Sequence, residues 1–155
     1  MVASPVLFDE ICDMLLECGL FNRLPPEDIQ AAARHFGAVR MDKGDVIFNE
    51  GDEGTFMAVV HEGRVSVIKK DLDDKPVVMG TEGTGHVIGE MAVLDGERRS
   101  ASCVAASDGV LLTLSREAMD EMLEEQPRLG AKILRAVAVS LSRRMRMATG
   151  KLVDG

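Results

Sequence analysis

The middle of the chain is divided by glycines into short apolar stretches. Between Gly37 and Leu114 these stretches alternate with turn residues, a pattern that indicates strands rather than helices. Evenly spaced short strands favour an antiparallel fold that is closed or double-layered, such as a jelly roll. The strands are expected near residues 46–48, 56–60, 65–68, 77–79, 87–88, 101–105 and 110–114.

The polar segment Asp71–Lys75 separates two of these stretches and is typical of a hairpin tip. Its aspartates are also compatible with a calcium loop. However, Pro76 and the lack of the required glycine do not fit the geometry of such a loop. A hairpin tip is therefore the better interpretation of this segment.

The N-terminal residues show helical periodicity instead. The apolar residues between Leu7 and Cys18 fall at helical spacing, and Gly19 is a suitable stop. The pair Pro25-Pro26 can open a second short helix, because proline costs little at the first helical position. The apolar side of that second helix is expected to be Ile29, Ala32, Ala33 and Phe36.

Helices are expected again at the C-terminal end. Ser115 can cap a helix that continues to Glu125. Pro127 can begin a last, long helix, which Gly150 would end after Thr149. The sequence thus predicts a mainly β fold with flanking helices, in one domain. Its parts are N-terminal helices (1–36), a strand region (37–114) and C-terminal helices (115–149).

Charge and composition exclude several classes of function. The formal net charge of -8 repels nucleic acid and anionic membranes on average. With 5 Phe and no Tyr or Trp, stacking platforms for RNA bases are not expected. The acids among the first residues do not fit a secretory signal peptide, and 3 Cys do not suggest a disulfide framework. We therefore expect a soluble, cytoplasmic protein without nucleic-acid or membrane partners.

The candidate motifs for catalysis or metal binding in this sequence do not have the spacing that such motifs require. Gly83-Thr-Gly85 followed by Gly89 has the wrong spacing for a dinucleotide loop, and no phosphate-loop pattern exists. The His residues share no metal-ligand spacing with the Cys residues. Cys103 can be a reactive thiol, although a small buried strand residue is the commoner situation. The sequence predicts neither an enzyme nor a metal or cofactor site.

One segment combines the groups that a ribose phosphate requires. Residues Gly89–Leu94 can form a short helical turn whose free N–H groups offer an anion site. Arg99 follows Glu90 after a turn at Gly96, so it can return to that site and make charge-assisted contacts to a phosphate. An ionised Glu90 only accepts hydrogen bonds, so it needs a hydroxyl donor. An arginine on a phosphate and an acid on a sugar hydroxyl describe a ribose phosphate site.

This segment, residues 85–105, resembles the phosphate-binding cassette of the cyclic nucleotide-binding domain family. The resemblance extends from about residue 20 to residue 125. It includes the glycine-spaced segments 44–54 and 56–67, which are similar to the β-roll signature of that family. The resemblance implies a double-stranded β-helix, the jelly-roll β-roll, with N-terminal helices and a long C-terminal helix.

The resemblance also implies roles for individual residues. Arg99 would clamp the cyclic phosphate, and Glu90 would accept a hydrogen bond from the ribose 2′-hydroxyl. Arg98, directly before Arg99, is a second arginine that departs from the family pattern. It would point to the opposite face of a strand, so it is expected to face solvent. Ser100 and Ala101 follow Arg99 as in the family and would complete the phosphate cradle. The other expected ligand-binding residues are Gly89, Met91 and Ala92 in the cradle, and Val67, Met79 and Val87 as apolar walls near the base.

The last helix is similar to the hinge helix of bacterial cyclic AMP receptor proteins. Those proteins continue into a DNA-binding domain, which this chain is expected to lack because it stops at Gly155. The resemblance places Arg144 and Thr149 near the nucleotide, where the helix would close over the pocket. The alternative is that Arg144 is one more charge on a solvated helix face and Thr149 a residue at a helix end.

The same helix carries an apolar heptad seam, which predicts a homodimer. Packing of this stripe on the β-roll of its own chain is equally compatible with the spacing. The seam consists of Leu134, Ala138, Leu141, Met145, Ala148 and Leu152.

Together these features predict a bacterial sensor that binds a 3′,5′-cyclic nucleotide and signals through its terminal helices. Cyclic AMP is favoured over cyclic GMP. Ser100 leaves that choice open, because a Thr or Ser after the arginine can help recognise guanine in the family. The alternative is a nucleotide-free β-roll in which Glu90 and Arg99 pair with each other and the fold serves protein interaction or dimerisation.

Overall fold

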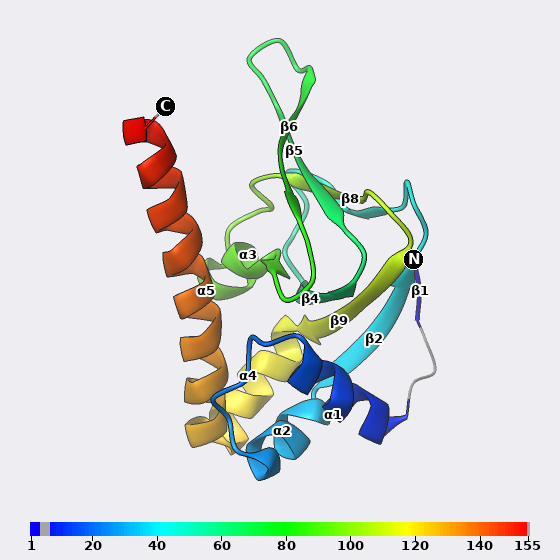
Figure 1. Cartoon of the computed structure of the whole chain (residues 1–155), viewed down its shortest axis with the longest axis vertical. Coiled ribbons are helices and arrows are strands. Elements are labelled where there is room, and N and C mark those ends of the chain that lie inside the picture. The colour runs from blue at the N-terminus through cyan, green and yellow to red at the C-terminus, as the bar shows by residue number, and fades with distance from the viewer. Residues whose placement is uncertain (4–6, 155) are drawn as a thin grey trace.

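Two antiparallel sheets form the middle of the molecule (Figure 1). The computed structural model describes residues 1–3 and 7–154, with side chains through residue 151. The strands are β1 (Val2–Ala3), β2 (Phe36–Met41), β3 (Val46–Phe48), β4 (Phe56–Glu62), β5 (Val65–Lys70), β6 (Pro76–Glu82), β7 (Val87–Ile88), β8 (Ser102–Ala105) and β9 (Gly109–Ser115). One sheet has the order β1-β2-β9-β4-β7 and the other the order β3-β8-β5-β6. The expected β-roll with flanking helices is therefore confirmed.

The helices flank the two sheets. They are α1 (Phe8–Glu17), α2 (Pro26–Ala33), α3 (Glu90–Asp95), α4 (Arg116–Glu125) and α5 (Pro127–Asp154). In Figure 1, α1, α2, α4 and the first turns of α5 lie together below the sheets, and the rest of α5 projects past α3. None of the described helices is long and apolar enough to span a membrane.

Most of the expected helix boundaries are confirmed. α1 ends just before Gly19, whose φ of 78° suits glycine. α2 begins at Pro26 with Pro25 at the N-cap. At the start of α4, the Ser115 hydroxyl accepts a hydrogen bond from the backbone N–H of Ala118 at 3.0 Å.

Two expectations about the ends of elements are wrong. Phe36 opens β2 instead of extending the α2 helix. α5 continues through Gly150 to Asp154, because a glycine costs a helix only about 1 kcal/mol relative to alanine. The strands β1 and β2 were not expected from the sequence. β1 pairs with β2 through Val2 opposite Arg40.

The β5–β6 hairpin has the tip that its polar residues predict. The carboxylate of Asp71 accepts hydrogen bonds from the backbone N–H groups of Asp73 and Lys75 at 2.8 and 2.9 Å. These bonds close the turn in the manner typical of aspartate. Beyond the tip, the apolar residues Val77–Met79 of β6 face solvent. This edge strand is therefore present where expected but contributes little to the core.

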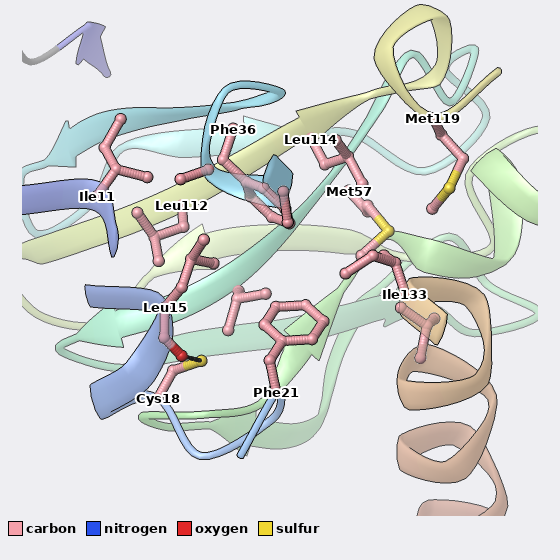
Figure 2. Close-up of a cluster of buried hydrophobic side chains, with 14 of the residues drawn as sticks. Ile11, Leu15, Cys18, Phe21, Phe36, Met57, Leu112, Leu114, Met119 and Ile133 are labelled. Carbon is pink, nitrogen blue, oxygen red and sulfur yellow. Dashed lines mark hydrogen bonds between the residues drawn. The ribbon is translucent and has the colours of Figure 1, made fainter. Parts of the chain in front are cut away.

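The main core lies between the five-stranded sheet and the helices. Figure 2 shows side chains from α1, β4, β9, α4 and α5 converging on one cluster. Phe21 belongs to this cluster and packs edge-to-face against Phe36, with ring centroids 5.9 Å apart. Ile133 and Val137 are fully buried in the same cluster and fix the first half of α5. The later turns of α5 are mostly exposed.

A second core cluster lies between the two sheets. It includes Phe48 of β3, Ile88 of β7 and Cys103 of β8. These three residues come from different strands and line one cavity. The packing between the sheets thus positions the candidate site.

Candidate functional site

The short helix α3 is placed against the sheets by two close approaches of backbone. Gly89, its N-cap, has a φ of 72°, and a Cβ there would collide with the guanidinium of Arg99 and the ring of Phe48. A Cβ at Gly54 would likewise collide with Ala92 of α3. Glycine at both positions lets α3 lie directly on the loop and strand that hold Arg99.

Arg99 is buried and held in a fixed orientation. Its side chain is only 3% exposed. Nη1 donates to the carbonyl of Gly89 at 2.7 Å, and Nη2 donates to the carbonyl of Phe56 at 2.5 Å. The guanidinium also lies 3.9 Å from the centroid of the Phe48 ring, a cation–π contact.

The charge of Arg99 has no anionic partner in the described part of the chain. No described carboxylate lies within 4.0 Å of its guanidinium, and its Nε is buried without a hydrogen-bond partner. Burial lowers the pKa of Arg99, yet an arginine stays protonated near neutral pH. A buried, unpaired cation that lines a cavity is a position suited to an anionic ligand.

Glu90, the first residue of α3, is only 2% exposed. It pairs with Arg144 of α5 and not with Arg99. The Glu90–Arg99 pair, expected for a nucleotide-free protein, is thus not found among the described residues. Arg144 also lies 3.9 Å from a carboxylate oxygen of Glu82, at the end of β6. Although α5 projects from the core, it is tied to α3 through this arginine.

A cavity of about 140 Å³ lies between α3, the cassette and α5. Nine of the twelve ligand-binding residues expected from the sequence line it: Val67, Gly89, Glu90, Met91, Ala92, Arg99, Ser100, Ala101 and Arg144. Three further lining residues, Phe48, Ile88 and Cys103, were not expected.

Three expected site residues lie elsewhere. Val87 is fully buried in the core on the helix side, because neighbouring strand residues point to opposite faces and Ile88 is the one that faces the cavity. Met79 is 63% exposed on the edge strand β6. The hydroxyl of Thr149 donates to the carbonyl of Met145 within α5 at 2.9 Å, so it is used inside its own helix.

Arg98 is exposed, as its strand position predicts, and donates to the carbonyl of Gly51 at 3.1 Å. Burial raises the pKa of the Cys103 thiol to about 12. Because the thiolate is the reactive form, this shift and the burial of Cys103 favour a structural role in the cavity wall over a reactive one. Strand alternation was the signal that would have identified Ile88, whereas Phe48 and Cys103 reach the cavity only through sheet packing.

Comparisons with known proteins agree with this geometry. The sequence profile of the family described as "Cyclic nucleotide-binding domain" matches residues 38–126. The cyclic AMP receptor protein of Thermus thermophilus is 33% identical over 129 residues, which cover 83% of this chain and 58% of that relative. The chain thus spans less than two thirds of the length of this curated relative.

Two solved structures show the similarity in three dimensions. A cyclic nucleotide-binding domain from Methylobacillus flagellatus has a TM-score of 0.83 and 29% identity, with 95% of this chain and 83% of that chain covered. The c-di-GMP-responsive global regulator CLP of Xanthomonas campestris has a TM-score of 0.72 and 25% identity, with 83% and 63% covered. Proteins named for different nucleotides therefore share this fold.

Proposed function

This chain belongs to the cyclic nucleotide-binding domain family, and we propose that it is a sensor that binds a 3′,5′-cyclic nucleotide in the cavity beside α3. The observation that carries the proposal is the buried guanidinium of Arg99, which faces the cavity without an acidic partner. The cyclic phosphate would supply the missing negative charge and accept charge-assisted hydrogen bonds. The role is regulatory, without catalysis.

The sugar would be recognised by Glu90. Its carboxylate is nearly inaccessible to water, so an uncompensated charge there is costly. A ribose 2′-hydroxyl can donate to it, because an ionised carboxylate only accepts hydrogen bonds. Ser100 and Ala101 line the same cavity and would complete the phosphate cradle.

Cyclic AMP is the proposed ligand in preference to cyclic GMP. The Thermus thermophilus relative is named a cyclic AMP receptor protein, which supports this choice. Ser100, next to Arg99, is compatible with both purines. A cytoplasmic location in a bacterial cell is part of the same proposal, because the similar receptor proteins are bacterial.

The cavity is smaller than most small-molecule sites. Small-molecule sites usually measure about 300–1,000 Å³, whereas this cavity measures about 140 Å³. Arg144 lines it from α5, so binding would reorient the Arg144 side chain while the helix closes over the ligand. A ligand can move α5 only if it binds one helix position more tightly than the other. This coupling would carry the signal from the β-roll to the terminal helix.

Hydrogen exchange tests binding and signalling together. At saturating cyclic AMP we expect slower exchange in residues 85–105 and in residues 127–149, because the ligand would order the cassette and the helix would close over it. Deleting residues 143–155 is expected to weaken binding. It should also abolish the ligand-dependent slowing of hydrogen exchange in residues 127–142. Unchanged exchange across residues 127–149 would contradict the switch, even where cassette protection demonstrates binding.

We also propose that α5 forms a homodimer. Met145 of the expected seam is 72% exposed, and Ala138 and Ala148 are exposed as well. Leu134 instead packs partly against the core of its own chain, and the side chain of Leu152 lies outside the described residues. The seam would therefore begin after the first turns of the helix.

A homodimer predicts a particle of about twice the chain mass of 16.8 kDa in light scattering at micromolar concentration. Replacing the exposed Met145 with glutamate is expected to shift that particle toward one chain mass. Met91, exposed on α3, is a matched control position, where the same substitution should leave the mass unchanged. A wild-type particle of a single chain mass would exclude the dimer.

A nucleotide-free interaction module remains the second candidate. The observation that favours it is the pairing of Glu90 with Arg144, which occupies the proposed ribose contact with a group of the chain itself. Such a protein would show no exchange differences with any cyclic nucleotide.

A further inference from the structure

The guanidinium of Arg144 lies between two carboxylates from different elements. It pairs with Glu90 of α3, and its Nη1 lies 3.9 Å from Oε1 of Glu82 at the end of β6. Among the described side chains, these two are the acids within ion-pair distance of Arg144. The distance to Glu82 permits attraction but exceeds that of a hydrogen bond, so Glu90 is the main partner in this arrangement.

Glu82 is held in place by a neighbour. Its other oxygen, Oε2, accepts a hydrogen bond from Nδ1 of His86 at 2.5 Å. The Glu82 side chain is only 16% exposed, so it cannot swing freely into solvent. One of its oxygens therefore stays on His86, while the other stays turned toward Arg144.

A ribose bound at Glu90 would change how Arg144 divides its contacts between Glu90 and Glu82. The hydroxyl would take acceptor positions on Glu90 that the guanidinium now uses. An arginine has five N–H donors in a rigid fork and no other way to be satisfied than by acceptors. Glu82 is already near Nη1 and has one oxygen without a hydrogen bond to His86.

We propose that Glu82 is a positioning residue that receives the Arg144 guanidinium when a ribose hydroxyl engages Glu90. The transfer from one carboxylate to the other keeps α5 docked over the occupied cavity. Glu82 thereby raises the affinity for the nucleotide without touching it. This inference rests on the proposed function, because it requires a ligand that competes for Glu90.

The test compares Glu82→Gln with the wild type and with Glu62→Gln. Glu62 ends β4 as Glu82 ends β6, and its recorded ion pair is with His61 rather than Arg144. Without ligand, hydrogen exchange in residues 143–151 of Glu82→Gln is expected to match the wild type, because Glu90 still holds Arg144. With saturating cyclic AMP, that segment is expected to exchange faster than in the wild type, and affinity should fall about tenfold. Glu62→Gln should match the wild type in both states.

A double-mutant cycle separates this role from a merely structural one. If Glu82 acts through Arg144, adding Glu82→Gln to Arg144→Gln should cause no further loss of affinity for cyclic AMP. Full additivity of the two substitutions would overturn the inference. So would faster exchange in Glu82→Gln that is equal with and without ligand.

The outcomes also distinguish this inference from the proposed function. If the wild type binds cyclic AMP or cyclic GMP and Glu82→Gln behaves like Glu62→Gln, only the role of Glu82 is wrong. If the wild type binds neither cyclic nucleotide, the proposed function and the role of Glu82 fail together.

Discussion

Replacing Arg99 with leucine is expected to weaken binding of the cyclic nucleotide by about thirtyfold or more. The guanidinium is the buried cation of the cavity, and removing one partner of a desolvated charge pair costs about 2–5 kcal/mol. Isothermal titration of wild type and variant with cyclic AMP measures the difference. A conservative Arg99→Lys variant should also bind weakly, because an ammonium cannot reproduce the planar fork.

Arg98→Leu is the matched control for this prediction. Arg98 is the neighbouring arginine, but it is exposed and donates only to the carbonyl of Gly51. Its loss should change affinity little. Because Arg99 also donates to the carbonyls of Gly89 and Phe56, thermal unfolding of each variant must show that it is folded before titration. Equal weakening by the two leucine variants, or a dominant effect of Arg98, would show that the phosphate role is assigned to the wrong residue.

Replacing Phe21 with alanine is expected to lower the free energy of unfolding by about 3–5 kcal/mol. Phe21 is 1% exposed in the main core and packs edge-to-face against Phe36. The substitution leaves a cavity among elements that cannot all collapse into it, since they belong to both helices and sheet. Denaturant unfolding followed by circular dichroism measures the loss.

Phe8→Ala provides the same chemical change at the surface. Phe8 is 39% exposed on α1, and its recorded contact is the guanidinium of Arg34 at 5.9 Å from the ring centroid. Its loss should cost about 1 kcal/mol or less. If the two alanine variants lose similar amounts, the core is not organised around Phe21.

Most strands and helix ends could be predicted because local chemistry determines them. Gly19, Pro26 and Ser115 act through backbone conformation and capping, which need no knowledge of the rest of the fold. The predicted end of the last helix at Gly150 is wrong, because the low helix propensity of glycine is only a weak preference. The strand β1 was missed because two residues carry no periodicity, and their pairing with β2 depends on distant chain.

In the candidate site, too, local sequence predicts the position of some residues, and packing between distant segments decides the position of others. Residues of the cassette lie around the cavity because they are close in sequence and held by one turn, as with Glu90 and Arg99. Met79 and Val87 were assigned to the apolar walls by resemblance, but strand register and an exposed edge decide where such side chains point. The position of Glu82 beside Arg144 joins β6 to α5, and no sequence spacing indicates such a contact.

Calorimetric titration of the wild-type protein with cyclic AMP, cyclic GMP and 5′-AMP tests the central claim most directly. The account predicts saturable binding of a cyclic nucleotide, tightest for cyclic AMP, with 5′-AMP much weaker and with the cyclic AMP signal largely lost in Arg99→Leu. Absence of saturable binding for both cyclic nucleotides in the folded wild-type protein would contradict it.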